Sequence, residues 1–354
     1  MWIIGCDLHT RYQVVAAVNT ETGEMIERTL AHRGDQVRAF YAGLDRPVRV
    51  GIEATGGFSW FEQLLGELGQ ELWVGDAAAI RAAVPRRQKN DPRDAQHLRR
   101  LLEQERFPRI WLASAEERDA RQLLMHRSKL VGLRTGLRNQ LQALALGQGL
   151  RRRRALWSKR GEEQLRQLAL GSWASERRRD LLELLGPIDE RIAALDAAVA
   201  QQAQRRPEAR RLMEQPGVGP VTALAFVLII GPVRRFRHSR QLVSYLGLNP
   251  REHSSGGHQR LGHISKQGNR MMRWLLVEAG QSAAQRDDEL HRFYTRLKFR
   301  RGANIAKVAV ARKLAVRLYW VLRQAQRQSQ RPTQPASRQG SPGTDMVEAI
   351  PSNS

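Results

Sequence analysis

The spacing of apolar residues changes along the chain and divides the first 325 residues into three parts. In the first part, short apolar runs such as WIIGCDLHT (2–10) and VRVGIEATG (48–56) are typical of strands. The segment FSWFEQLLGELG (58–69) has the three- and four-residue spacing of a helix that ends at Gly69. The order predicts three strands in a meander, turning near 21–23, and then strands alternating with helices. This order indicates an α/β RNase H-like domain over residues 1–112.

Residues 113–210 carry leucines every three or four positions, with Arg, Glu and Gln between them. This pattern predicts a helical coiled coil that serves as a linker or a dimerisation region. Between its two arms lies the basic run RRRRALWSKR (151–160). That run is either a solvated loop or a tip that grips phosphate.

The third part, residues 211–325, is predicted to be a mainly α-helical domain interrupted by a Gly/Ser-rich stretch at 249–269. The remaining residues, 326–354, are polar and rich in Pro, Ser and Gln, so we expect a disordered tail. The longest apolar run, VTALAFVLIIG (221–231), is too short to span a bilayer.

The net charge of the chain indicates which class of molecule it binds. The chain has 59 Lys+Arg against 35 Asp+Glu, a net charge of +24, which favours a nucleic acid over the weaker alternative of an acidic membrane surface. Most of the basic residues are arginines, which suits phosphate binding but equally fits a GC-rich genome. Cys6 is the only cysteine, which fits a reducing cytoplasm, and Asp7 follows the first apolar residues too soon for a signal peptide.

Four acidic residues stand out against this basic background. Asp91 and Asp94 are three residues apart, so they share one face of a helix; they mark either an ordinary helix start or a divalent metal. Asp7 ends the first strand, and Glu53 lies in an apolar strand, where an acid is costly unless paired or metal-bound. An RNase H-like sheet can bring all four to one edge, where carboxylates suit one or two Mg²⁺ ions for phosphoryl transfer.

The motifs around these acids, GCDLH, GIEATGG and KNDPRDA, resemble the Asp–Glu–Asp–Asp signature of the DEDD insertion-sequence transposases. That family includes the Piv-type DNA invertases, and its N-terminal domain is similar to the RuvC junction resolvase. Residues 215–279, beginning QPGVGPVTALAF, resemble the family's C-terminal transposase domain. One departure is Asn90, where the family commonly has Thr.

The resemblance implies a DNA transposase or site-specific recombinase that binds Mg²⁺ through Asp7, Glu53, Asp91 and Asp94. It also implies a serine nucleophile in the loop EHSSGGHQR (252–260). Ser255 matches best, and the adjacent Ser254 is the alternative. A non-coding bridge RNA as guide, and assembly as a dimer that becomes a tetramer on donor and target DNA, are further implications of the resemblance.

Several residues of the third part are candidates for nucleic-acid contact. Gly217 and Gly219 in PGVGPVTA (216–223) fit a helix–hairpin–helix turn whose N–H groups meet a phosphate, or else a plain connection between helices. Further candidate phosphate contacts are Arg251, Arg260 and Lys266. Tyr245, a conceivable nucleophile in tyrosine recombinases, lies in LVSYLGL, which predicts helix core instead.

Two other classes of function stay open at this point. A RuvC-like structure-specific endonuclease that uses metal-activated water would explain the four acids but would leave the serine loop without a role. A non-catalytic nucleic-acid-binding protein would make the four acids a coincidence.

Overall fold

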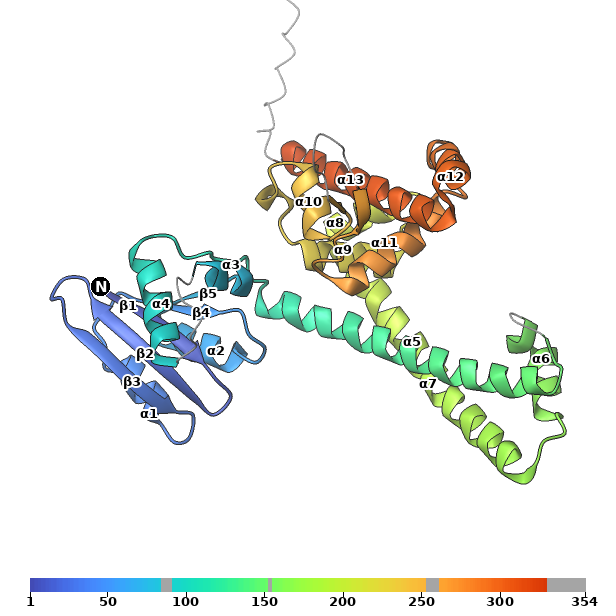
Figure 1. Cartoon of the computed structure of the whole chain (residues 1–354), viewed down its shortest axis with the longest axis horizontal. Helices are drawn as coiled ribbons and strands as arrows, with labels where there is room; N and C mark the ends of the chain where they lie inside the picture. Colours follow the sequence, from blue (N-terminus) through green and yellow to red (C-terminus); the bar gives the residue numbers. More distant parts are fainter. Residues whose placement is uncertain (84–90, 152–154, 253–260, 330–354) are drawn as a thin grey trace, which may run out of the picture. The chain divides into compact units, whose positions relative to one another are not determined.

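The computed structural model describes residues 1–83, 91–151, 155–252 and 261–329, and the chain divides into two compact units, Met1–Leu112 and Ala113–Ser354 (Figure 1). Each unit is described by itself. The predicted subdivision of the second unit near residue 210 stays a prediction. Helix α13 continues to Ser329, past the expected start of the tail at 326, and the rest of the tail lies outside the described residues.

The first unit is built on one five-stranded mixed sheet in the order β3-β2-β1-β4-β5. The pairs β1–β2 and β2–β3 are antiparallel, whereas β1–β4 and β4–β5 are parallel. The strands are β1 (Trp2–Leu8), β2 (Tyr12–Asn19), β3 (Met25–Ala31), β4 (Val48–Glu53) and β5 (Glu71–Gly75), and the helices are α1 (Gln36–Ala42), α2 (Ser59–Glu67), α3 (Ala77–Ala82) and α4 (Asp91–Glu103). The predicted meander and the RNase H-like fold are confirmed.

Helices cover both faces of the sheet. Alternate residues of β1 point to opposite faces and pack in separate clusters. Ile4 and Cys6 are fully buried in a cluster that includes residues of α1 and α2. Ile3 packs with Leu98 of α4 in a second cluster, and Figure 1 shows α4 lying across the strands. The unit therefore has three layers, with α4 on the face to which Gly5 points.

The second unit begins with the predicted coil. Helices α5 (Ala115–Gly147) and α7 (Ser172–Arg205) run antiparallel, because Arg127 pairs with Asp196 near one end and Arg134 pairs with Asp189 further along. The N-terminal part of α5 is bound to the rest of the unit by Arg121, which donates two hydrogen bonds to the Leu228 carbonyl of α9 at 2.9 and 2.5 Å.

The segment between the two arms contains a short 3₁₀ helix, η1 (Ala155–Trp157), and helix α6 (Lys159–Arg166). Leu156 and Leu165 are fully buried against α5 and α7, and Arg138 lies 5.0 Å from the Trp157 ring centre. The solvated-loop interpretation of the basic run 151–160 is therefore wrong for residues 155–160, since the buried Leu156 fixes this part of the chain. Residues 152–154 of the basic run lie outside the described residues.

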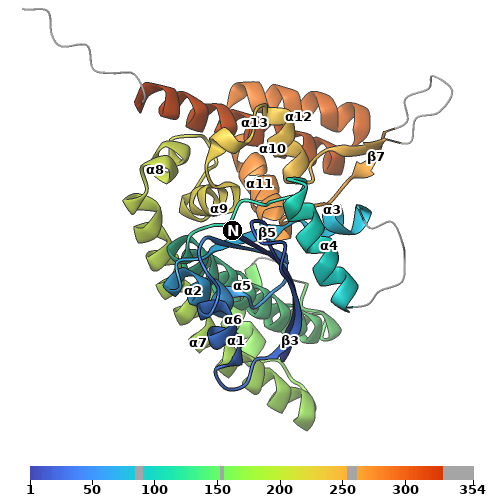
Figure 2. The ribbon, with the colours of Figure 1, turned by 90° about the vertical axis from the view of Figure 1, so that its left-hand side faces the viewer.

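The remaining elements form a mainly helical bundle, as predicted. They are α8 (Pro207–Met213), α9 (Pro220–Ile230), η2 (Val233–Arg235), α10 (Ser239–Tyr245), β6 (Pro250–Glu252), β7 (Leu261–Ile264), α11 (Arg270–Ala283), α12 (Asp288–Arg301) and α13 (Ala303–Ser329). Helix α9 is apolar on nearly all sides and lies inside the bundle, while α12 packs beside α13 (Figure 2).

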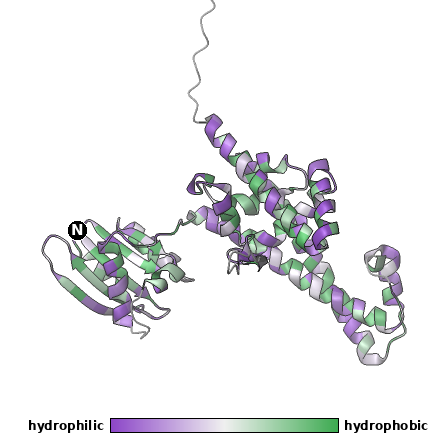
Figure 3. Cartoon of the chain, turned by 45° about the horizontal axis from the view of Figure 1, so that its top comes forward, coloured by the Kyte–Doolittle hydropathy of each residue, from purple (hydrophilic) through white to green (hydrophobic). Residues whose placement is uncertain are grey.

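Figure 3 colours each residue by hydropathy. Hydrophobic residues lie along strands of the first unit, whereas hydrophobic and hydrophilic residues alternate along the long helices of the second unit. Across the described ranges, no helix has both the length and the apolar content needed to cross a membrane.

Candidate active site

Asp7 and Glu53 lie side by side at the carboxyl edge of the sheet. The register of the parallel strands β1 and β4 pairs Gly5 with Gly51 and Cys6 with Ile52, so Asp7 and Glu53 occupy the next position on each strand. Alternation places both acids on the face of the two glycines. Each is half-buried. Two acids that are 46 positions apart in sequence therefore become neighbours because their strands are parallel.

Helix α4 reaches this edge because Gly5 has no side chain. A Cβ at Gly5 would lie 2.1 Å from the Ala95 carbonyl oxygen and 2.3 Å from the Arg99 nitrogen, both backbone atoms of α4. The helix backbone therefore rests directly on β1. This contact places the first turn of α4, which holds Asp91 and Asp94, over the end of the strand.

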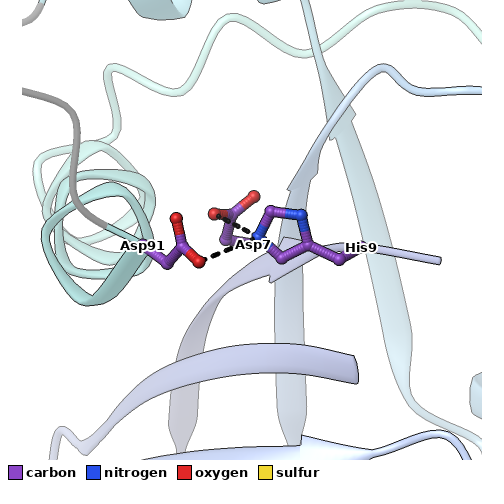
Figure 4. A group of neighbouring side chains, drawn as sticks. All are labelled: Asp7, His9 and Asp91. Carbon is purple, nitrogen blue, oxygen red and sulfur yellow. Dashed lines mark ion pairs between the residues drawn. The ribbon is translucent and has the colours of Figure 1, made fainter. Parts of the chain in front are cut away.

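Asp7, His9 and Asp91 converge at this point (Figure 4). His9 Nε2 lies 3.2 Å from Asp7 Oδ2 and 3.4 Å from Asp91 Oδ2. Tyr12, at the start of β2, donates a hydrogen bond of 2.9 Å from its hydroxyl to the same Asp91 oxygen, and its ring centre lies 4.7 Å from that of His9. Tyr12 therefore orients both Asp91 and His9.

The electrostatics of the surrounding groups favour this arrangement. The hydrogen bond to Asp91 raises the pKa of Tyr12, so its hydroxyl stays protonated and continues to donate near neutral pH. Burial raises the pKa of the Cys6 thiol, which points to the opposite face of the sheet from Asp7. Cys6 is thus a protonated core side chain and not a member of the site.

The four predicted acids do not all join the same tight group. Among the described residues, the set whose possible ligand atoms all lie within 4.8 Å of one another consists of Asp7, His9 and Asp91. Glu53 and Asp94 are half-buried beside this set, on β4 and in the first turn of α4. The four-acid ligand set therefore remains a prediction.

His9 belongs to this group although it was not among the predicted site residues. The signal was present in GCDLHT, since residues two apart on an extended chain point to the same side, as Asp7 and His9 do.

The chemistry of this set suits a divalent metal ion. Two carboxylates with ligand oxygens this close together repel each other unless a cation lies between them. Carboxylate oxygen is the ligand that Mg²⁺ prefers, whereas an imidazole nitrogen also suits transition metals such as Mn²⁺ or Zn²⁺. The residues therefore fit a metal, and the donor set leaves its identity open.

The PGVGP turn has the glycine conformation that the sequence suggested, but Gly217 has a packing role. Gly217 has a φ of +78°, and a Cβ there would lie 2.4 Å from the Ala283 nitrogen of α11. Its backbone is therefore pressed against another helix. Gly219 is exposed at the start of α9, with no atom within 4 Å of its ideal Cβ position, and nucleic-acid contact by either glycine stays a prediction.

The segments on either side of residues 253–260 form a two-stranded neck that the sequence did not predict. Strands β6 and β7 pair Pro250 with Ile264 and Glu252 with Leu261. Below them, Gly247 and Gly268 both have positive φ, and a Cβ on either would lie 2.0 Å from a carbonyl oxygen of the opposite segment. Glycine is therefore required at both positions, and the two segments interlock.

The neck also holds two of the basic candidates. Arg251 is exposed and donates a hydrogen bond of 3.4 Å to the Ser265 carbonyl, while Lys266 is exposed with a φ of +57°. Ser255, Ser254 and Arg260 lie outside the described residues.

Tyr245 is not a core residue, contrary to the prediction. Its side chain is 40% exposed, and Arg235 lies 4.5 Å from its ring centre, although the neighbouring Val243 and Leu246 are buried. The heptapeptide is apolar on average, but Tyr245 is at the last turn of α10, where one side is open.

Two family models of transposases match this chain, one over its N-terminal part and one over its C-terminal part. A family model for a DEDD-type transposase matches residues 4–148, and the model of the Transposase IS116/IS110/IS902 family matches residues 209–295. A protein named probable family 20 transposase from Pseudomonas aeruginosa is 33% identical over 330 residues, covering 90% of this chain and 96% of the relative.

Two further relatives are transposases of named insertion sequences. That of IS1111A from Coxiella burnetii is 32% identical over 80% of this chain and 81% of its own length. That of IS1328 from Yersinia enterocolitica is 26% identical over 78% of this chain and 84% of its own length. The matches extend over both units and exclude the non-catalytic class of function. The chain belongs to the IS110/IS116/IS902 family of transposases, DNA-binding enzymes that catalyse the transposition of insertion sequences.

Proposed function

We propose that this transposase cuts and rejoins DNA through a covalent bond between Ser255 and a DNA phosphate, with Mg²⁺ held by Asp7, Glu53, Asp91 and Asp94. The observation that carries the proposal is the convergence of Asp7 and Asp91 at the carboxyl edge of the sheet, within the segment that matches the DEDD model. His9 adds a nitrogen donor to this set.

The acids and the serine have separate tasks. Bound Mg²⁺ would neutralise charge on the phosphate and stabilise the leaving oxygen. The Ser255 hydroxyl attacks phosphorus and loses its proton to a base, a serine–phosphate ester forms, and the bond to the leaving DNA strand breaks. The released strand oxygen takes up a proton. Attack by the hydroxyl of another strand then reverses these bonds, frees Ser255 and joins the DNA.

The neck described above supports a positional role for the serine loop. A nucleophile gains rate only when it is held near the reacting atom. Interlocking of Gly247 with Gly268, together with the β6–β7 pairing, fixes both ends of the segment that carries Ser255. A plain linker between helices would not need two glycines locked against opposite carbonyls.

We also propose a non-coding RNA guide and assembly as a dimer that forms a tetramer on DNA. The net charge of +24 can neutralise two nucleic acids at once. The long antiparallel pair α5–α7 supplies an extended surface for a second copy. RNA that co-purifies with the chain, in amounts that depend on salt, would support the first proposal, and a monomer by light scattering in the presence of DNA would contradict the second.

The nucleophile is tested by comparing Ser255→Ala with its neighbour Ser254→Ala on DNA that carries the ends of the element. We expect Ser255→Ala to abolish strand cleavage and Ser254→Ala to retain part of it, because only one hydroxyl forms the ester. Denaturing gels should show DNA attached to protein, and peptide mapping should place the adduct within 249–260.

The alternative function, a RuvC-like endonuclease that uses metal-activated water, predicts different products. It gives free 5′ and 3′ ends, no adduct, and cleavage that survives Ser255→Ala. Asp91→Asn should stop cleavage under either mechanism, so it checks the metal site independently of the serine. Cleavage by Ser255→Ala without an adduct would replace the serine mechanism with this alternative.

A further inference from the structure

The turn between α12 and α13 presents an exposed aromatic ring among cations. Phe299, in the last turn of α12, is 94% exposed, the largest exposed fraction among the exposed large apolar side chains of the described residues. Lys298, Arg300 and Arg301 surround it in sequence, and all three are exposed. Ile305, at the start of α13, is 56% exposed.

The charged side chains at the two ends of α12 differ in whether they form ion pairs. At its first turn, Asp287 pairs with Arg317 of α13 at 2.6 Å, and Glu289 pairs with Lys313 at 2.7 Å. These contacts pair two of the three acids at the start of the helix with basic side chains of α13. Within the described parts of the chain, no side-chain ion pair or hydrogen bond involves Lys298, Arg300 or Arg301. The last turn is therefore a concentration of cations without internal partners.

The same face of α12 continues this pattern toward its middle. Arg296 lies three residues before Phe299, and Arg292 lies four residues before Arg296, so the three side chains follow one stripe on the helix. Both arginines are exposed. Cations do favour a helix C-terminus for dipole reasons alone, which would explain Arg300 and Arg301. Dipole compensation gives no reason for an exposed phenyl ring at the end of this stripe of arginines.

We propose that the α12–α13 turn is a DNA-contact surface, in which the Phe299 ring stacks on a base exposed where the duplex is opened or kinked. Lys298, Arg300 and Arg301 bind the flanking phosphates. Aromatic side chains set among basic residues stack on the bases of unpaired strands in this way in proteins that bind single-stranded nucleic acid. Stacking on a base needs a flat ring with an open face, and the Phe299 side chain is 94% exposed.

DNA fits this surface better than a second protein chain does. The enzyme family acts on DNA, strand exchange requires opened duplex, and the basic stripe is complementary to phosphate. A second copy of this chain would bring the same unpaired cations against one another if the contact were two-fold symmetric, which is repulsive. This surface does not depend on the serine mechanism, so the two proposals can fail separately.

The aromatic contact is tested with the full-length chain and two fluorescein-labelled probes, a fully paired duplex and the same duplex with a short unpaired bubble. Fluorescence anisotropy should show that Phe299→Ala weakens binding to the bubble duplex about tenfold and binding to the paired duplex less. Phe299→Trp should bind like the wild type, while Phe299→Leu should resemble Phe299→Ala, because leucine keeps the apolar surface but not the ring. Since the side chain is exposed, thermal unfolding should be unchanged in all three.

The phosphate contacts are tested by the salt dependence of binding. Replacing Arg300 and Arg301 by Ser should reduce the slope of log K against log salt by roughly 2. The matched control replaces Arg28 and Arg33, two exposed arginines of the first unit, and removes the same charge from another surface. Equal slopes for the two double variants, or wild-type affinity of Phe299→Leu for the bubble duplex, would overturn the proposal. A changed oligomeric state of Phe299→Ala with unchanged DNA affinity would assign the surface to protein contact instead.

Discussion

Gly5 is the residue that allows α4 to rest on the sheet, so Gly5→Ala should separate Asp91 from Asp7. The added methyl group would meet the Ala95 carbonyl oxygen at 2.1 Å and the Arg99 nitrogen at 2.3 Å. Both are backbone atoms inside a helix, and neither can rotate away. The helix as a whole must move off β1.

The size of this displacement follows from atomic radii. Contact between carbon and oxygen needs about 3.4 Å, so α4 must recede by roughly 1.3 Å. The Tyr12–Asp91 hydrogen bond, now 2.9 Å, would lengthen to roughly 4 Å and break. Overpacking of this kind costs about 3 kcal/mol of local stability. Loss of an oriented ligand should weaken metal binding by roughly tenfold to a hundredfold.

Gly51→Ala is the matched control, because Gly51 is paired with Gly5 across the two parallel strands and faces the same helix layer. Its new methyl group would meet the ends of two side chains, Leu102 at 2.7 Å and Phe107 at 2.9 Å. These can rotate. We expect a cost of about 1 kcal/mol and nearly unchanged metal affinity.

Two measurements on the full-length chain check this reasoning. Hydrogen exchange of the α4 and β1 amides reports the local opening free energy, and titration with Mn²⁺ followed by electron paramagnetic resonance reports the affinity. Wild-type Mn²⁺ affinity and unchanged α4 protection in Gly5→Ala would refute the claim that this contact sets the site. Equal effects of the two alanines would show that volume alone, and not the backbone contact, is responsible.

Two smaller perturbations have equally definite outcomes. Tyr12→Phe removes the hydroxyl that orients Asp91 and should weaken Mn²⁺ binding about tenfold with little change in thermal unfolding, and an unchanged affinity would remove Tyr12 from the site. Arg317 lowers the pKa of Asp287 below its ordinary value of 3.8, so the stability from this pair is complete above that value and is lost as the pH falls through the lowered pKa. Asp287→Asn keeps the helix cap and should abolish this acid-dependent rise in α12 amide exchange; an identical pH profile would contradict the assignment.

The sequence predicted the structure correctly where the spacing of apolar residues and the direction of the strands determine which residues become neighbours. Alternation in β1 and the meander order placed Asp7 correctly, and parallel pairing with β4 placed Glu53 next to it. The family motifs then led to the first turn of α4. The sheet therefore followed from local patterns, because each strand has a buried face with a period of two.

Features that depend on close backbone contact were not predictable in the same way. The two-residue spacing of Asp7 and His9 was visible in the sequence, but the approach of Asp91 to His9 depends on the contact between β1 and α4 at Gly5. The β6–β7 ribbon was missed because its strands are only three and four residues long and lie in a Gly/Ser-rich stretch. Tyr245 was misplaced because average hydropathy does not say which side of a helix end is open.

The anchoring of α5 gives this helix the mechanical character of a lever. Its 33 residues span about 50 Å, and Arg121 in its second turn binds the Leu228 carbonyl of the buried helix α9. A tilt of about 10° at Arg121 would carry the far end of the helix, about 40 Å away, through roughly 7 Å, because displacement grows with the length of the arm. Small shifts within the bundle that carries the neck would thus produce large movements at the Trp157 end, and forces applied there would return to the bundle through the buried side chains of Ala120 and Leu124 as well as the Arg121 guanidinium.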